Sequence, residues 1–306
     1  MMTPSAPRAL NFIKASQNPD GGWGYRPGGQ SFVEPTGFSL LAFGPRGDKD
    51  ALGRGLGFLK SCLKENGAVG TGPRDPEGSW MAYAALLAFH AHGAAAEERR
   101  LTDWVLSFED ASIRFTPAER SAIATIYRYD ASIPGWPWTP NTTAWVEPTA
   151  LFMIALLRAG VPPSQDRIRS GISLILDRRV PSGGWNFGNP YSKSYELEAS
   201  LMSTALALAA LGAAGTPESR PGVGEGLRLL RRGLAGDVST ASLAWILLAL
   251  KCYPAGASLV TGVSERLARL QAADGSFRRN IFETALAAVV LEDPAVIIPT
   301  AGRSGG

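Results

Sequence analysis

The chain contains very little cysteine or histidine, with two of each among its 306 residues. Cys62 and Cys252 form no disulfide framework, and with His90 and His92 they lack the spacing of a zinc site. So few thiols are typical of a reduced cytosol. We therefore expect a cytoplasmic protein with no bound metal and no cofactor.

An excess of charge of one sign and long apolar runs are also missing. Thirty basic residues against 27 acidic ones give a net charge of +3, which is too small to indicate a nucleic-acid partner. Residues 1–15 lack the apolar core of a signal peptide. The longest uncharged apolar stretch, residues 240–250, is about half of what a bilayer span requires. We expect a soluble protein, with peripheral membrane contact as a secondary expectation and its protein partners unknown.

The chain does contain a turn-like phrase that recurs about every 50 residues, each time shortly before an apolar segment. The first copy reads Gln17-Asn-Pro-Asp-Gly-Gly-Trp23, and the last reads Gln271-Ala-Ala-Asp-Gly-Ser-Phe277. Each copy ends in a large aromatic residue, which we interpret as packing between repeats. These repeat aromatics are Trp23, Trp80, Trp136, Trp185 and Phe277.

Two kinds of helix are predicted to alternate between these turns. One kind is amphipathic, as in residues 52–63, whereas the other is apolar on nearly every side and must be buried all round. The alternation predicts an all-α fold, an α6–α6 toroid in which six helical hairpins form a double ring. We expect one domain over residues 1–300 and a flexible tail over 301–306. The buried helices are predicted to start near Thr36, Ser79, Pro148, Ala199, Thr240 and Phe282.

The third repeat is longer than the others. Thr116-Pro-Ala-Glu119 has the pattern of a capping box with proline at the first helical position. It predicts an additional helix that runs to about Tyr127.

The repeats, with Gln-x-x-Asp-Gly-Gly/Ser-Trp/Phe before a buried helix, resemble those of the squalene–hopene cyclases and the protein prenyltransferase β-subunits. The resemblance covers nearly the whole chain and implies the α6–α6 toroid of that superfamily, with an isoprenoid ligand. The catalytic motifs of the family are not matched. Its cyclases use an Asp-x-Asp-Asp run, whereas the nearest acidic clusters here are Asp48-Lys-Asp50 and Glu109-Asp110. Its zinc enzymes use an Asp, an Asp-x-Cys pair and a His, whereas Cys62 and Cys252 each lack an Asp two residues earlier and only His90 and His92 are available.

A repeated carboxylate is the main candidate for chemistry. Glu34 and Glu147 lie in near-identical segments, Phe32-Val-Glu-Pro-Thr36 and Trp145-Val-Glu-Pro-Thr149, and each is predicted to be the N-cap of a buried helix. Stabilisation of the helix dipole is one explanation. The other is a general acid whose pKa is raised by an apolar setting, with Glu147 as the first candidate and Glu34 as its partner. In the fourth repeat, Glu196 and Glu198 lie near the matching place.

Aromatic residues outside the repeat positions are candidates for ligand contact, because aromatic faces both bury a hydrocarbon chain and stabilise a carbocation. Together with Trp136 and two carboxylates of the fourth repeat, they form the predicted substrate-binding set. Its members are Tyr25, Phe32, Trp136, Trp138, Trp145, Tyr195, Glu196 and Glu198.

Three functional hypotheses follow. The favoured one is an isoprenoid-handling protein, resembling a terpene cyclase or prenyltransferase, with a polyprenyl or triterpenoid-like chain in a central apolar cavity and carboxylates at its rim. The first alternative is a non-catalytic toroid that binds a lipid or a protein. The second is a carbohydrate-active α/α toroid, in which paired carboxylates and aromatic platforms also occur.

Overall fold

The computed structural model describes residues 6–45 and 47–299, so the predicted tail at 301–306 lies outside the described residues. The chain divides into two compact units. Unit 1 combines the residues up to Ser107 with Thr261–Ile297, and unit 2 combines Phe108–Val260 with the residues after Ile297. A single domain over residues 1–300 stays a prediction.

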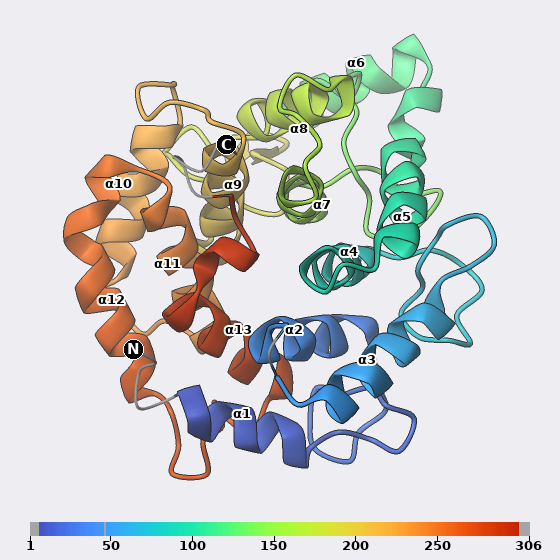
Figure 1. Ribbon diagram of the computed structural model, residues 1–306. Coiled ribbons are helices and arrows are strands. Elements are labelled where there is room, and N and C mark those ends of the chain that lie inside the picture. Colours follow the sequence, from blue (N-terminus) through green and yellow to red (C-terminus); the bar gives the residue numbers. More distant parts are fainter. Residues whose placement is uncertain (1–5, 46, 300–306) are drawn as a thin grey trace. The chain divides into compact units, whose positions relative to one another are not determined.

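In unit 1, helix α2 (Val33–Phe43) packs against both α4 (Ala82–Ala91) and α13 (Ile281–Glu292), as Figure 1 shows. Three amphipathic helices cover this group from outside, α1 on α13, α3 on α2 and α5 on α4. A 3₁₀ turn, η3, follows α13, and α12 begins in unit 2 and ends in unit 1. The bounds of the other elements are α1 Ala6–Ala15, α3 Lys49–Cys62, α5 Ala95–Ser107, α12 Ala257–Arg269 and η3 Pro294–Val296.

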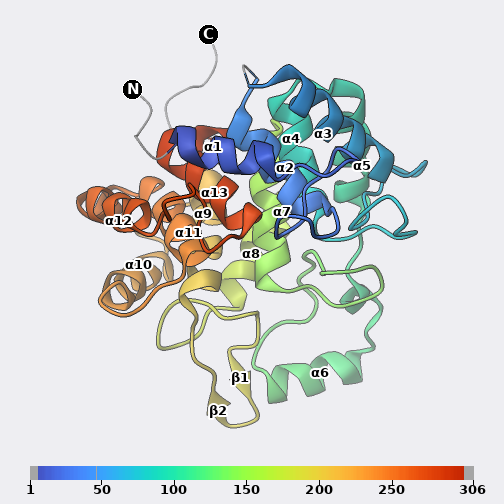
Figure 2. The same cartoon turned by 90° about the horizontal axis from the view of Figure 1, so that it is seen from below.

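Unit 2 repeats this arrangement, with α9 (Leu201–Ala213) packed against both α7 (Val146–Arg158) and α11 (Thr240–Lys251). The amphipathic helices α8 and α10 lie on α7 and α9. Helix α6 and the antiparallel β1–β2 hairpin extend away from α7 and α9 (Figure 2). The remaining bounds are η1 Ala111–Arg114, α6 Pro117–Ile126, α8 Asp166–Asp177, β1 Tyr191–Ser192, β2 Tyr195–Glu196, α10 Val223–Gly233 and η2 Pro254–Gly256.

The predicted alternation of helices is confirmed. The six helices predicted to be apolar on every side are α2, α4, α7, α9, α11 and α13, and each buries most of its side chains. Each starts within one helical turn of the predicted residue. Each follows an amphipathic helix, such as α8, which buries only the stripe Ile168, Gly171, Leu174 and Ile175. This burial pattern follows from the 3.6-residue period of the apolar positions.

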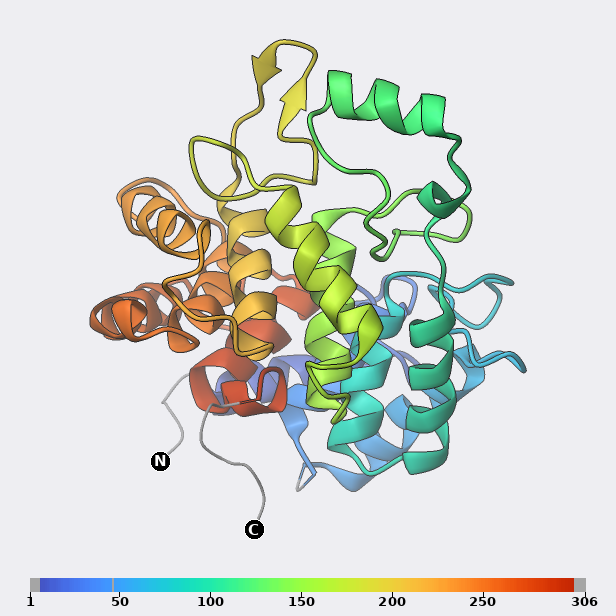
Figure 3. The same cartoon turned by 90° about the horizontal axis from the view of Figure 1, so that it is seen from above.

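The additional helix α6 is also confirmed. Thr116 accepts a hydrogen bond from the Glu119 amide, and the Glu119 carboxylate accepts one from the Thr116 amide at 2.7 Å. Helix α6 buries none of its residues, and it lies apart from α7 in Figure 3 as well. Its caps therefore contribute a large share of its local stability.

Four turns of the described chain share one hydrogen-bond pattern. The amide of the first residue donates to the carbonyl four residues later, and the carbonyl of that first residue accepts from the amide three residues later. In the first turn, Asn18 and Gly22 are joined in this way at 2.9 Å, and Gly21 has a φ of 87°. A Cβ on Gly21 would lie 2.5 Å from the Arg54 carbonyl oxygen, so this position requires glycine. The four turns begin at Asn18, Lys64, Val180 and Ala272.

These turns identify which residues are equivalent between repeats. The residue after each turn is Trp23, Val69, Trp185 or Phe277, and all four are buried. Val69 therefore occupies the second of these positions, and Trp80 does not. The sequence phrase around Trp80 is a separate loop, and this tryptophan is half-buried and stacks on Tyr83.

Two of the repeat aromatics, Trp23 and Trp185, join their turn to the helices on either side. The backbone amide of Trp23 donates to the Thr36 hydroxyl in α2 at 2.9 Å, and its indole donates to the Ile13 carbonyl in α1 at 2.7 Å. Trp185 makes the same pair of bonds, to Thr204 and Ile175. The amides of Trp136 and Phe277 likewise donate to Thr149 and Thr284.

Candidate functional site

Glu34 lies at the start of α2, where the structure corrects the predicted register. The N-cap is Phe32, and Glu34 is the second helical residue rather than the N-cap itself. Pro35, which an N-cap at Glu34 would place at the first helical position, is the third helical residue. This is tolerated because the first four amides of a helix have no partner within it, so proline there removes no helical hydrogen bond. The Val33 amide is satisfied by the Thr71 carbonyl at 3.0 Å.

Two tyrosines hold the Glu34 carboxylate. The Tyr25 hydroxyl donates to Oε2 at 2.6 Å, and the Tyr83 hydroxyl donates to Oε1 at 2.7 Å. Tyr25 comes from the loop after the first turn, and Tyr83 comes from α4. Only 5% of Glu34 is exposed. Both oxygens of this buried carboxylate accept a hydrogen bond from a phenol group, as burial of a polar group requires.

The surroundings of this carboxylate are aromatic. Tyr25 packs against Phe32 and Phe282 at centroid distances of 5.7 and 6.3 Å. Phe38 packs against Tyr83 at 5.9 Å and edge-on against Phe282 at 5.0 Å. Trp80 stacks on the other ring partner of Glu34, Tyr83, at 6.0 Å. We call these six side chains, Tyr25, Phe32, Phe38, Trp80, Tyr83 and Phe282, the aromatic cluster.

Burial in this setting raises the pKa of Glu34 from its ordinary value of 4.5 to about 7. Loss of hydration disfavours the carboxylate, whereas the hydrogen bonds from Tyr25 and Tyr83 favour it and offset part of the rise. The pKa values of both tyrosine hydroxyls are raised, chiefly by burial and further by the Glu34 charge. Glu34 is therefore the group here that changes its protonation near neutral pH.

Glu147 takes the matching position in α7, with Trp145 as the N-cap. It is half-buried, and it accepts a hydrogen bond of 2.7 Å from the Ser203 hydroxyl in α9. Burial raises its pKa, and the Ser203 bond opposes the rise. The prediction that Glu147 is an N-cap is wrong by the same two positions as for Glu34.

The remaining predicted carboxylates lie elsewhere. Tyr195 and Glu196 form strand β2 of the exposed hairpin, with Tyr195 76% exposed and Glu196 accepting from the Ser182 amide at 2.8 Å. Glu198 follows and is also exposed. Because α9 starts at Leu201, the residue that matches Glu34 in the fourth repeat is Met202, so Glu196 and Glu198 do not continue the series.

The other predicted ligand-binding aromatics differ in burial. Trp136 is fully buried, and the guanidinium of Arg167 lies 4.3 Å from the centre of its ring. Phe32 and Trp145 are half-buried N-cap residues of α2 and α7, and Trp138 is half-buried beyond Trp136. Among the predicted residues, the structure brings Tyr25, Phe32 and Glu34 together within unit 1.

Tyr83 is the residue of this site that sequence reasoning missed. It lies in the apolar run of α4, 49 positions from Glu34. The signal was its hydroxyl, because a polar atom in a helix buried on every side requires a hydrogen-bond partner. The sequence does not show which partner that is.

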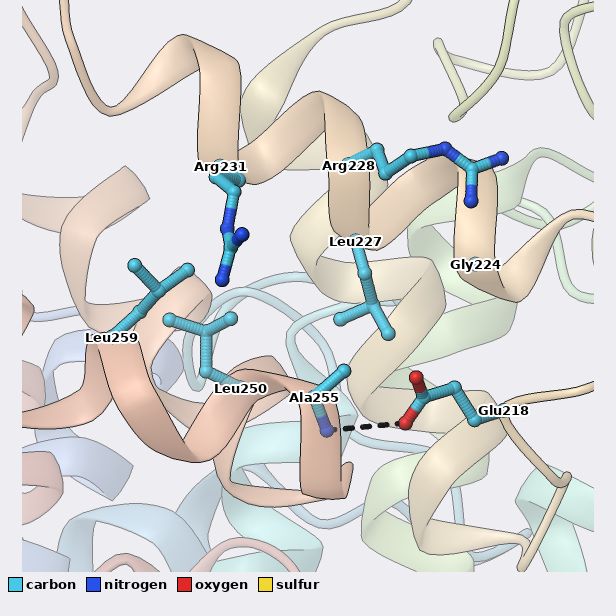
Figure 4. A pocket seen from close by; sticks show the side chains of 8 residues that line it. All are labelled: Glu218, Gly224, Leu227, Arg228, Arg231, Leu250, Ala255 and Leu259. Carbon is cyan, nitrogen blue, oxygen red and sulfur yellow. Dashed lines mark hydrogen bonds between the residues drawn. The ribbon is translucent and has the colours of Figure 1, made fainter.

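A cavity in unit 2 has a different character from the surroundings of Glu34. It has a volume of about 220 Å³ and lies between α10, η2 and α12, with a floor that includes Leu227 and Leu250 (Figure 4). Arg231 and Glu218 lie at its edge, and Glu218 accepts from the Ala255 amide at 3.2 Å. Opposite charges on an open surface do not suit an extended hydrocarbon, so this cavity is a weaker candidate than the Glu34 environment.

The described part of the chain contains no group of three or more histidine, cysteine or acidic residues placed to hold a metal ion. Nor does any helix within residues 6–45 and 47–299 combine the length and apolarity needed to cross a bilayer.

Comparison with solved structures finds similar folds at low identity. The type II terpene cyclase MstE from Scytonema has a TM-score of 0.60 at 17% identity, over 94% of this chain and 96% of that one. An α-amylase from Clostridium perfringens has a TM-score of 0.65 at 11% identity, over 94% and 97%. The ent-copalyl diphosphate synthase from Streptomyces platensis reaches 0.51 at 18% identity, over 87% of this chain and 49% of that one. No family model and no curated protein sequence matches the chain.

These likenesses establish the fold class. The predicted all-α, α6–α6 toroid class is confirmed, and the resemblance to terpene cyclases holds at the level of the fold. At these identities the likeness carries no activity or ligand to this chain.

Proposed function

We propose that this protein is an isoprenoid-handling enzyme in which Glu34 is the proton donor of a terpene cyclase-like reaction. The observation that carries the proposal is a buried carboxyl group, held by two phenols in an aromatic cluster, whose pKa of about 7 leaves it substantially protonated at neutral pH. We still predict that the protein is cytoplasmic. We also predict peripheral contact with a membrane, which would give it access to such a substrate.

The proposed reaction balances without a cofactor. The Glu34 proton adds to a carbon of a terminal alkene, forming a C–H bond and leaving a tertiary carbocation and the Glu34 carboxylate. Aromatic faces stabilise the cation by their π electrons. Attack by the next double bond forms a carbon–carbon bond and closes a ring, and loss of a proton from the last cation gives a neutral isomer of the substrate.

Glu34 takes precedence over Glu147 on the contacts of the two residues. Glu34 is almost completely buried and has two phenol donors, whereas Glu147 is half-buried and has one serine donor. The aromatic cluster supplies Glu34 with π faces within its own unit. Glu147 remains the competing donor that the experiment must test.

The similar structures support an isoprenoid substrate class. MstE variants have been solved with geranylgeranyl dihydroxybenzoate as substrate and with merosterolic acid A as product. We therefore propose a polyprenyl chain as the ligand of this protein, and a geranylgeranyl compound as the first substrate to test.

The experiment is an incubation of the purified protein with geranylgeranyl dihydroxybenzoate and with geranylgeraniol, with cyclised isomers detected by mass spectrometry and chromatography. We expect Glu34→Gln to lower turnover by about 100-fold or more, as for the loss of a general acid. Glu119→Gln, in the exposed capping box of α6, is the control and should leave turnover unchanged.

The same assay decides between the alternatives. If Glu147→Gln abolishes turnover and Glu34→Gln does not, the proton donor is Glu147. If the wild type binds the geranylgeranyl compounds without converting them, the protein is a lipid-binding toroid and the enzymatic proposal fails.

The likeness to the α-amylase favours a second candidate, a carbohydrate-active enzyme. Glycoside hydrolysis generally uses two carboxyl groups flanking the scissile bond. The groups that shift the pKa of Glu34 are two tyrosines, with no second carboxyl among them. Release of reducing sugar from soluble starch, lost in Glu34→Gln, would favour this candidate over the isoprenoid one.

A further inference from the structure

The two tyrosines that hold Glu34 differ in their access to solvent. Tyr83 is 1% exposed, lies within α4 and is flanked by the rings of Phe38 and Trp80. Tyr25 is half-buried and lies in a loop among exposed residues, Arg26 to Gly28. One carboxylate oxygen thus faces a sealed phenol, and the other faces a phenol whose residue reaches the surface.

We infer that Tyr25 relays protons between solvent and Glu34 Oε2, whereas Tyr83 only positions the carboxylate. In the proposed reaction this relay returns the proton that Glu34 gives to the substrate in each cycle. That catalytic consequence rests on the proposed function. The relay itself requires only the protonation of Glu34 in the free protein.

The transfer can be written with every proton placed. Tyr25 passes its hydroxyl proton along the 2.6 Å hydrogen bond to Glu34 Oε2, and in the same step its oxygen takes a replacement proton from a hydronium ion, which becomes water. The O–H bond of tyrosine breaks and reforms, so neither a free tyrosinate nor a net change at Tyr25 results. A concerted exchange is required because the buried site and the Glu34 charge both disfavour an ionised phenol.

The local structure keeps the Tyr25 hydroxyl directed at Glu34. The Tyr25 ring packs against Phe32 and Phe282, and its carbonyl accepts the Ile281 amide at 2.8 Å. The hydrogen-bond partners of the Glu34 carboxylate are the two tyrosine hydroxyls. A proton that reaches Oε2 through the protein therefore passes through Tyr25.

The test uses the protein without substrate. After a rapid drop in pH from about 8.5 to 5.5, across the Glu34 pKa, the carboxyl infrared band of Glu34 is followed in time and identified by its loss in Glu34→Gln. Tyr25→Phe should slow the appearance of this band by about tenfold or more, whereas Tyr83→Phe should change its rate by less than about threefold. Tyr25→His should restore much of the rate, because imidazole also accepts and donates a proton.

The outcomes are distinct. Equal rates in the wild type and in a folded Tyr25→Phe would overturn the relay, and so would equal slowing by both Phe variants. If circular dichroism shows that Tyr25→Phe has lost secondary structure, the relay is tested instead by comparing Tyr25→His with Tyr25→Gln. Slow protonation of Glu34 in Tyr25→Gln, together with fast protonation in Tyr25→His, would support the relay.

Kinetics on substrate separate this inference from the proposed function. With enzyme in excess and Glu34 protonated at the start, Tyr25→Phe should complete its first turnover at nearly the wild-type rate. Its steady-state turnover should be lower than that of the wild type. Turnover that persists in Glu34→Gln contradicts the proposed function alone. A loss in Glu34→Gln with normal steady-state turnover in Tyr25→Phe contradicts the relay alone.

Discussion

The raised pKa of Glu34 predicts a specific dependence of stability on pH. The folded protein binds the Glu34 proton more tightly than the unfolded chain, because its pKa is about 7 when folded and near 4.5 when exposed. The stabilisation associated with the protonated carboxyl is fully present below pH 4.5 and is lost as the pH rises to about 7. Since one pKa unit corresponds to about 1.4 kcal/mol, the loss amounts to about 3 kcal/mol.

Glu34→Gln isolates this contribution. Glutamine is uncharged at every pH and can still pair with both phenols, accepting from one and donating to the other. Urea unfolding of both proteins, followed by circular dichroism from pH 4.5 to 8, gives the free energy of unfolding at each pH. We expect the variant to match the wild type near pH 4.5 and to exceed it by about 3 kcal/mol near pH 8.

Glu147→Gln is the matched comparison, because Glu147 has the same position in its helix but is half-buried. The gain in the free energy of unfolding of Glu147→Gln over the wild type should have the same sign as that of Glu34→Gln and be smaller, since solvent reaches the Glu147 carboxylate. A difference between Glu34→Gln and the wild type that stays constant from pH 4.5 to 8 would refute the reasoning. So would a variant that becomes less stable than the wild type as the pH rises, which would mean that the charged carboxylate is the stabilising form.

Two further predictions concern the repeats. Thr36→Val should lower the free energy of unfolding by about 1–3 kcal/mol, because the buried Trp23 amide loses its acceptor, whereas the exposed Thr125→Val should have a much smaller effect in the same denaturant titration. Thr116→Ala should speed hydrogen exchange of the α6 amides by removing a cap worth about 1 kcal/mol, with the melting temperature nearly unchanged because α6 buries no residue. Exchange in α6 as slow as in the wild type, or an unchanged stability of Thr36→Val, would contradict the respective argument.

The arrangement of helices could be predicted because the pattern of apolar and polar residues in each helix shows how much of it is buried. A segment such as residues 82–91 has no polar stripe, so only a site enclosed by other elements suits it. The α6 cap was equally readable, since Thr116 and Glu119 bond each other's backbone within one turn. Both signals are local, so they can be recognised in the sequence without knowledge of the tertiary structure.

The candidate site was only partly predictable because its contacts are not local. The repeat of Glu34 and Glu147 was visible, but proline after each glutamate suggested an N-cap two residues too late. Tyr83 meets Glu34 only through the packing of α4 on α2. Val69 has no aromatic ring, so its equivalence to Trp23 shows in the turn hydrogen bonds alone.

Unit 1 is assembled from both ends of the chain, and this has a consequence for synthesis on the ribosome. Helix α2 ends at Phe43, but α13, which packs against it, starts at Ile281. At about 5–20 residues per second, the roughly 240 intervening residues take about 10–50 s to synthesise. Throughout that interval the nascent chain has Tyr25 without its Ile281 partner and α2 without its α13 cover. Unit 2, nearly continuous in sequence, can complete its packing first, so the Glu34 environment is among the last parts of the molecule to form.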